Sequence, residues 1–212
     1  MIKDIDIYYF SGTGNTLLVV KKMADVFREN GAATRLLKIE KSDPARINTA
    51  RTIGLAFPVA AQSTYPLVWE FIEQLPPAQS TGVFMVDTLA AFSGGIVGPL
   101  RKLLTGKGYR PLGAKEIVMP NNFLPGKINH EKNERKKEFG LKKAGKFAVS
   151  LLEGTASWGR VPIISDLLCK ISRSRKVSNY LSRKGSRFTL SEFLPFGVNF
   201  WARSGRKRKL TS

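Results

Sequence analysis

The residues with the clearest chemistry form one short segment near the start of the chain, Ser11-Gly12-Thr13-Gly14-Asn15-Thr16. Its two glycines let a ligand approach the backbone closely, and free N–H groups at the start of a helix would point at the same spot. Three hydroxyl side chains and one amide add further hydrogen-bond donors. The segment therefore predicts a cradle for a phosphate group. The alternative interpretation is a glycine-rich turn whose hydroxyls only cap the helix.

Two common nucleotide-binding loops do not fit this segment. A Walker A loop needs a lysine after its last glycine, and the segment has none. The dinucleotide fingerprint needs a third glycine at the position that Leu17 occupies. A hydroxyl-rich cradle without lysine suits a terminal phosphate monoester better than a triphosphate with magnesium.

The elements around the segment must position it. Residues 5–10 are rich in β-branched and aromatic side chains and predict a strand, and from Asn15 to Asn30-Gly31 the apolar spacing is helical. Further strands are predicted at residues 33–39, 51–57, 82–87 and 115–119, and further helices at residues 66–75, 95–105 and 131–152. The last helix is expected to bury an apolar stripe of Phe139, Leu141, Ala144, Phe147, Ala148, Leu151 and Leu152.

Strands that alternate with helices imply crossover connections and a parallel sheet with helices on both faces. Five strands in about 155 residues predict an α/β fold with a doubly wound, five-stranded parallel sheet in the order 2-1-3-4-5. In such a sheet the ligand crevice lies beyond the carboxyl ends of strands 1, 3 and 4. The loops after Phe10, Phe57 and Asp87 are therefore expected to form the site.

Residues 9–16 (Tyr-Phe-Ser-Gly-Thr-Gly-Asn-Thr) resemble the flavin mononucleotide (FMN) phosphate loop of flavodoxins, in the variety often fused to a two-cluster ferredoxin. Further matches occur at residues 54–59, at Gly94-Gly95 with Gly98, and at residues 119–123, so the resemblance covers about residues 3–153. It implies a flavodoxin-like fold and FMN as cofactor. The cofactor-binding residues that it implies are Ser11, Gly12, Thr13, Gly14, Asn15, Thr16, Pro58, Val59, Ala60, Asp87, Thr88, Phe92, Ser93, Gly94 and Gly95.

Several side chains near these loops have two interpretations. Asp87 either hydrogen-bonds the flavin pyrimidine edge or caps the loop that follows it. Phe92 and Tyr65 either stack on the flavin ring or pack within their own loops. Residues 58–65 contain no glycine, whereas flavodoxins commonly place there a glycine peptide that flips at flavin N5, and a flip is costlier without glycine.

Four other polar or reactive side chains have weaker signals. Asn121 and Asn122 either reach the crevice or form a turn. His130 is expected to be a solvated residue at a helix start, and Cys169 a small buried hydrophobe. One cysteine and one histidine exclude an intramolecular disulfide and the common multi-histidine metal sites.

Charge is concentrated in the last quarter of the chain. The whole sequence has 35 Lys and Arg against 16 Asp and Glu, and residues 155–212 alone hold 13 against 2. We therefore expect a flavodoxin-like domain over residues 1–154 and a basic, partly apolar extension over residues 155–212. Cations beside an apolar aromatic stretch favour an anionic membrane surface or an acidic partner. A tail that packs on the domain is the alternative, and nucleic acid is the least favoured partner.

These observations predict an FMN-binding protein that shuttles electrons between redox partners, with no catalytic side chain and no metal site of its own. The chain has no Cys-x-x-Cys, so any iron–sulfur cluster is expected to belong to a redox partner. The excess of basic residues predicts an acidic docking face on the partner. One alternative is an FMN-dependent oxidoreductase that acts on a quinone, a porphyrin precursor or NAD(P)H at a membrane surface. A second is a flavin-free interaction module with the same fold.

The expected location of the protein follows from two patterns that the sequence lacks. The first ten residues do not show the basic and then apolar order of a signal peptide, and no apolar run approaches the roughly 20 residues that span a bilayer. We expect a cytoplasmic protein, with peripheral attachment at the inner membrane face through residues 155–212 as the alternative.

Overall fold

The computed structural model describes residues 2–59, 63–90, 95–120 and 129–159. Its five strands form one parallel sheet in the order β2-β1-β3-β4-β5, which confirms the predicted fold class. The strands are β1 (Asp4–Tyr9), β2 (Ala33–Lys38), β3 (Thr52–Pro58), β4 (Gly82–Leu89) and β5 (Arg110–Val118).

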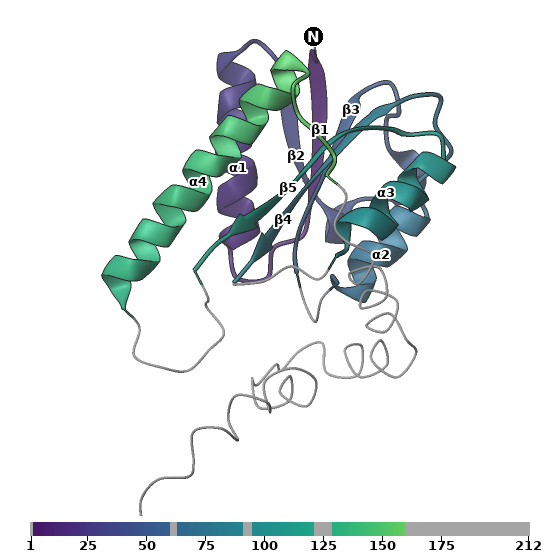
Figure 1. Cartoon of the computed structure of the whole chain (residues 1–212). Helices are drawn as coiled ribbons and strands as arrows, with labels where there is room; N and C mark the ends of the chain where they lie inside the picture. Colours follow the sequence, from purple (N-terminus) through teal and green to yellow (C-terminus); the bar gives the residue numbers. More distant parts are fainter. Residues whose placement is uncertain (1, 60–62, 91–94, 121–128, 160–212) are drawn as a thin grey trace, which may run out of the picture.

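Helices cover both faces of the sheet, with α1 and α4 on one face and α2 and α3 on the other (Figure 1). The helices are α1 (Asn15–Glu29), α2 (Pro66–Glu73), α3 (Val97–Gly106) and α4 (His130–Glu153), and two short 3-10 helices, η1 (Ile39–Lys41) and η2 (Pro44–Arg46), lie between β2 and β3. None of the helices within the described residues is long and apolar enough to cross a membrane.

Strand β4 shows why both faces must be covered, because seven of its eight residues are buried. Successive side chains of a strand point to opposite faces. Phe84 and Val86 pack in the core under α1 and α4, whereas Val83 and Met85 pack in the core under α2 and α3. The same alternation places Asp87 on the face of Val83 and Met85.

Strand β5 begins five residues before its predicted start, at Arg110 instead of Lys115. Pro111 and Gly113 weaken the sequence signal for a strand. The structure pairs Val83 with Pro111 and Phe84 with Gly113, so Leu112 is an extra residue in β5. This bulge tolerates residues that a regular central strand would exclude.

The buried stripe of α4 differs from the predicted one at Phe139, which is 58% exposed. The helix buries the predicted Ala144, Phe147, Ala148 and Leu151, and with them Gly140, which was not predicted; Leu141 and Leu152 are half-buried. Gly140 is required for this packing, because a Cβ there would come within 3.0 Å of the Val118 carbonyl oxygen. Since Gly140 faces β5, its neighbour Phe139 is rotated about 100° away from the core.

The chain after α4 crosses the outer edge of β5. Gly154 ends the helix with φ at 72°, and the Ala114 amide then donates to the Ser157 carbonyl oxygen at 3.1 Å. Trp158 is buried on the opposite face, where its Nε1 donates to the Val97 carbonyl oxygen at 3.0 Å. Residues 155–159 therefore pack on the sheet, and the rest of the predicted extension, with Cys169, lies outside the described residues.

Candidate functional site

Helix α1 begins at the predicted phosphate cradle. Its N-cap is Gly14, whose φ of 91° favours glycine and which has no side chain to cap the helix. The Leu17 amide donates to Ser11 Oγ at 3.2 Å and the Leu18 amide to the Gly14 carbonyl oxygen. The N–H groups of residues 12–16 have no acceptor among the described residues. The helix start therefore presents unpaired donors and the positive end of the helix dipole at one spot.

Two of the predicted side-chain donors are already engaged within the protein. Asn15 Nδ2 donates to the Pro120 carbonyl oxygen at 2.8 Å, and Thr16 Oγ1 lies 2.8 Å from Thr88 Oγ1. Thr16 is buried, whereas Thr13 is exposed. Asn15 and Thr16 thus join the loop to β5 and β4, and the Thr13 hydroxyl together with the backbone amides remains open to a ligand.

A cleft adjoins the cradle where β1, β3, β4 and β5 end. The described residues that line it carry no charged side chain, and they are Gly12, Thr13, Asn15, Thr16, Pro58, Val59, Tyr65, Thr88, Leu89, Ala90, Met119 and Pro120. Its volume of about 70 Å³ is well below the roughly 300–1,000 Å³ of small-molecule pockets. The described residues therefore account for part of a site only.

Hydrogen bonds hold the two ends of the segment after β3. Thr64 Oγ1 donates to the Pro58 carbonyl oxygen at 3.0 Å, and the Val59 amide donates to the Thr88 carbonyl oxygen at 2.8 Å. Tyr65 packs edge-on against Phe10 with 5.0 Å between ring centroids, and burial raises the pKa of its hydroxyl. Tyr65 both packs and lines the cleft, so its two interpretations remain open.

Asp87 lies beside the cleft without lining it. The side chain is fully buried, and neither carboxylate oxygen has a hydrogen-bond partner among the described residues. Its neighbour across the sheet is Glu116, whose Oε1 is also buried without a partner. Burial, and then the charge of Glu116, raise the pKa of Asp87 well above its ordinary value. A buried carboxyl of this kind favours its protonated form.

The structure brings together part of the predicted cofactor-binding set. Seven of these residues line the cleft: Gly12, Thr13, Asn15, Thr16, Pro58, Val59 and Thr88. Ser11, Gly14 and Asp87 are chain neighbours of lining residues but do not line the cleft, and neither does Gly95. Ala60, Phe92, Ser93 and Gly94 lie outside the described residues, as do Asn121 and Asn122.

Four lining residues were not among the predicted ligands: Leu89, Ala90, Met119 and Pro120. Their types carry no chemical signal. Met119 and Pro120 belong to the matching segment 119–123, and Leu89 and Ala90 could have been indicated only by their position at the end of β4. His130 is an exposed first residue of α4, as expected, and the side chain that caps this helix is Asn129, whose Oδ1 accepts from the Lys132 amide at 2.9 Å.

Comparisons with known proteins support the fold. No family model matches the chain, and a search of curated proteins finds no match. Among solved structures, flavodoxin 1 from Bacillus cereus is similar with a TM-score of 0.54 and 12% identity, over 71% of this chain and 98% of that protein. A short-chain flavodoxin associated with a non-canonical PDU bacterial microcompartment has a TM-score of 0.54 and 13% identity, over 74% of this chain and 100% of its own.

A flavodoxin from Streptococcus pneumoniae TIGR4 is similar with a TM-score of 0.50 and 17% identity, over 68% of this chain and 99% of that protein. At these identities the similarity concerns the backbone architecture. The chain has the flavodoxin-like α/β fold.

Proposed function

We propose that the protein binds FMN at the cleft and transfers electrons between redox partners. The observation that carries the proposal is the start of α1. There the N–H groups of residues 12–16 lack acceptors among the described residues, and a Cβ at Gly12 or Gly14 would meet no atom within 4 Å. Unpaired amides at a helix start bind phosphate through hydrogen bonds and the helix dipole. The resemblance of residues 9–16 to flavodoxin loops and the flavodoxin-like fold support FMN as the phosphate-bearing ligand.

The residues of the cleft fit such a ligand. The backbone of residues 12–16 and the Thr13 hydroxyl would hold the phosphate, and Pro58, Val59 and Ala90 would border the ring from the loops after β3 and β4. The described lining carries no charge, so backbone dipoles and the exclusion of water would set the reduction potential of the ring. When bound, FMN supplies the redox chemistry, so no side chain of this chain needs to act as a nucleophile or proton donor.

A substitution at Gly12 tests the cradle without disturbing the fold. A Cβ built at this position meets no atom within 4 Å, and the residue does not need a positive φ. Gly12→Val should therefore fold normally while its side chain enters the space of the phosphate. Gly106→Val is the matched control, because a Cβ at Gly106 is equally free of contacts and lies at the far end of α3.

Each protein is reconstituted with FMN and titrated by the quenching of flavin fluorescence. We expect the unmodified chain and Gly106→Val to bind alike, and Gly12→Val to lose at least about 100-fold in affinity, since a lost phosphate site removes several charge-assisted hydrogen bonds. Absence of flavin absorption in the reconstituted chain would contradict the proposal and favour the flavin-free interaction module. Equal binding by Gly12→Val would contradict the cradle.

Electron transfer is tested separately from binding. The flavin-loaded protein should pass electrons from a reduced donor protein to an acceptor protein, and should not turn over NAD(P)H or quinones in the steady state. Sustained turnover with either small substrate would favour the oxidoreductase alternative.

A further inference from the structure

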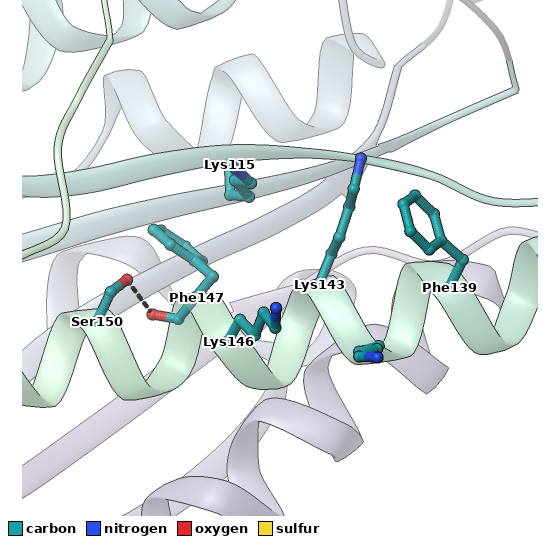
Figure 2. A pocket seen from close by; sticks show the side chains of 7 residues that line it. Lys115, Phe139, Lys143, Lys146, Phe147 and Ser150 are labelled. Carbon is teal, nitrogen blue, oxygen red and sulfur yellow. Dashed lines mark hydrogen bonds between the residues drawn. The ribbon is translucent and has the colours of Figure 1, made fainter.

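A second concave surface lies away from the cleft, between α4 and β5. This lysine groove is lined by Lys115 of β5 and by Phe139, Lys142, Lys143, Lys146 and Phe147 of α4, and its volume is about 480 Å³. Figure 2 shows Phe139, Lys143 and Phe147 projecting from α4 toward the strand that carries Lys115. The lysine groove shares no lining residue with the cleft.

The lysines of the groove have no anionic partner among the residues that the structure describes. In the first half of α4 two of the four basic residues are paired, Arg135 with Glu131 at 2.6 Å and Lys137 with Glu134 at 2.9 Å. Between Glu138 and Glu153 the helix has no acidic residue. Within the described part of the chain, none of the four lysines of the groove forms an ion pair.

This arrangement is unfavourable for the isolated helix. Lys142 and Lys146 are four residues apart and Lys143 and Lys146 three, so their like charges are neighbours on one face. The cost is removed when an anion binds between them. The groove is therefore built to receive negative charge from another molecule.

The apolar side chains show what kind of anion fits. Phe139 is 58% exposed, and Lys143 Nζ lies 4.6 Å from the centre of its ring. Phe147, which also lines the groove, is buried. An exposed aromatic ring beside cations favours an occupant that combines carboxylates with apolar side chains.

Charge excludes the two occupants that the protein itself could supply. Residues 160–212 hold 13 basic and 2 acidic residues, so this segment would be repelled from the lysines. A second copy of the chain carries a net charge of +19 and would be repelled as well. A bilayer is flat and does not fit a concave surface. A nucleic-acid backbone offers no apolar group at its phosphates that could pack on the phenylalanines of the groove.

We propose that the lysine groove binds an acidic segment of a partner protein, one that carries at least one apolar side chain. The carboxylates of the segment pair with Lys115, Lys142, Lys143 and Lys146, and its apolar side chain packs on Phe139. The proposal goes beyond the proposed flavin chemistry and does not depend on it, because the two surfaces are separate. The chain without flavin should bind the segment as well as the flavin-loaded chain does.

The test uses the full chain and two synthetic peptides as probes. One peptide is glutamate-rich with interspersed phenylalanine, and in the other serine replaces each phenylalanine. A triple variant of the groove, Lys142→Glu with Lys143→Glu and Lys146→Glu, should lower the affinity for the first peptide at least about tenfold. The matched control is Lys38→Glu with Lys41→Glu and Lys102→Glu, which changes the net charge equally at exposed lysines outside the groove and should lower the affinity less than about threefold.

The basic extension also attracts acidic peptides, so the position of binding is measured directly. Carbodiimide joins peptide carboxylates to lysines in contact, and mass spectrometry should find the joined lysines at positions 115, 142, 143 and 146. Phe139→Ser should weaken binding of the phenylalanine peptide and leave the serine peptide unchanged.

Three results would overturn the proposal. The first is an equal loss of affinity in the two triple variants, which would indicate net charge alone. The second is cross-linking confined to residues 160–212. The third is binding of phosphatidylserine vesicles or of duplex DNA that depends on the groove lysines while neither peptide binds, which would assign the surface to a different class of partner.

Discussion

Two fully buried aspartates occupy opposite ends of the sheet, Asp6 in the first half of β1 and Asp87 near the carboxyl end of β4. Asp6 Oδ1 accepts hydrogen bonds from Arg35 Nε at 2.7 Å and from Arg51 Nε at 2.8 Å, and Arg35 also bonds the second oxygen. Asp87 has no hydrogen-bond partner among the described residues and faces a second carboxyl, that of Glu116.

The two environments move the pKa values in opposite directions. Burial alone would raise the pKa of Asp6, but the hydrogen bonds and charges of Arg35 and Arg51 outweigh burial and lower it. At Asp87 burial and the charge of Glu116 act together and raise the pKa. The paired end of the sheet serves stability. Asp87, next to the cleft, has no hydrogen-bond partner among the described residues, whereas buried polar groups with a purely structural role are normally hydrogen-bonded.

The largest expected effect comes from removing the partners of Asp6. Arg35→Met combined with Arg51→Met leaves a buried carboxylate without compensation, which typically costs about 3–5 kcal/mol. Urea unfolding followed by circular dichroism measures the loss. Arg46→Met is the control, because the Arg46–Asp43 pair is at the surface and contributes less than about 1 kcal/mol. A double variant as stable as the unmodified chain would show that the amino end does not depend on this network.

Asp87→Asn should stabilise the protein, in contrast to the loss of stability expected for the double arginine variant. The folded protein holds this buried carboxyl in its protonated form, whereas the unfolded chain ionises it at neutral pH. Asparagine removes that cost, so we expect the free energy of unfolding at neutral pH to rise by about 1–3 kcal/mol. Glu116→Gln should stabilise the protein less, because Glu116 is less buried. Destabilisation by Asp87→Asn would mean that the ionised carboxyl has a favourable partner, and would remove the contrast between the two ends.

Asp6 and Asp87 should make the free energy of unfolding depend on pH in opposite directions. Asp6 has a lowered folded pKa, so its contribution is complete above the unfolded value of about 3.9 and is lost as the pH falls through the lowered pKa. Asp87 has a raised folded pKa, so stability is lost as the pH rises from about 3.9 through the raised pKa. Between the folded and unfolded values each group changes stability by about 1.4 kcal/mol per pH unit.

Unfolding measured from acid to neutral pH should therefore respond differently to Asp6→Asn and to Asp87→Asn. Asp6→Asn should reduce the loss of unfolding free energy as the pH falls below about 4. Asp87→Asn should reduce the loss of unfolding free energy as the pH rises above about 4. If both variants change stability over the same pH range, the inference that the two pKa values are shifted in opposite directions is wrong.

The smallest effect concerns the hydroxyl pair that joins the cradle to β4. Thr16→Val leaves the buried Thr88 hydroxyl without its partner and should cost about 1 kcal/mol. Thr16→Val combined with Thr88→Val removes both hydroxyls and should restore most of the loss. A double variant that is worse than both single variants would show that the hydroxyls have further partners.

Local patterns were sufficient to predict most of the fold. The apolar run of β4 and the change to helical spacing at Asn15 are properties of neighbouring residues, and both elements lie where the sequence placed them. The start of β5 was missed because its pairing with β4 accommodates an extra residue, Leu112. Phe139 was assigned to the core because it is apolar, although the orientation of α4 against β5 exposes it.

The cradle was predictable for the same reason as the fold, since residues 11–16 carry the donors and the helix start within one short segment. The free or engaged state of each donor was not predictable. The partners of Asn15 and Thr16 are Pro120 and Thr88, which lie 105 and 72 residues further along the chain. These contacts leave the backbone and Thr13 as the open donors.

By itself, the sequence determined the alternation of strands and helices, the position of the phosphate cradle and the concentration of charge in residues 155–212. Each of these depends on residues that are close in the chain. Only the tertiary structure set Asp87 beside Glu116 and Lys115 beside the lysines of α4, because strand register and helix packing join residues that are far apart in sequence. The unpaired carboxyls and the unpaired lysines are therefore properties of the assembled sheet and its helices.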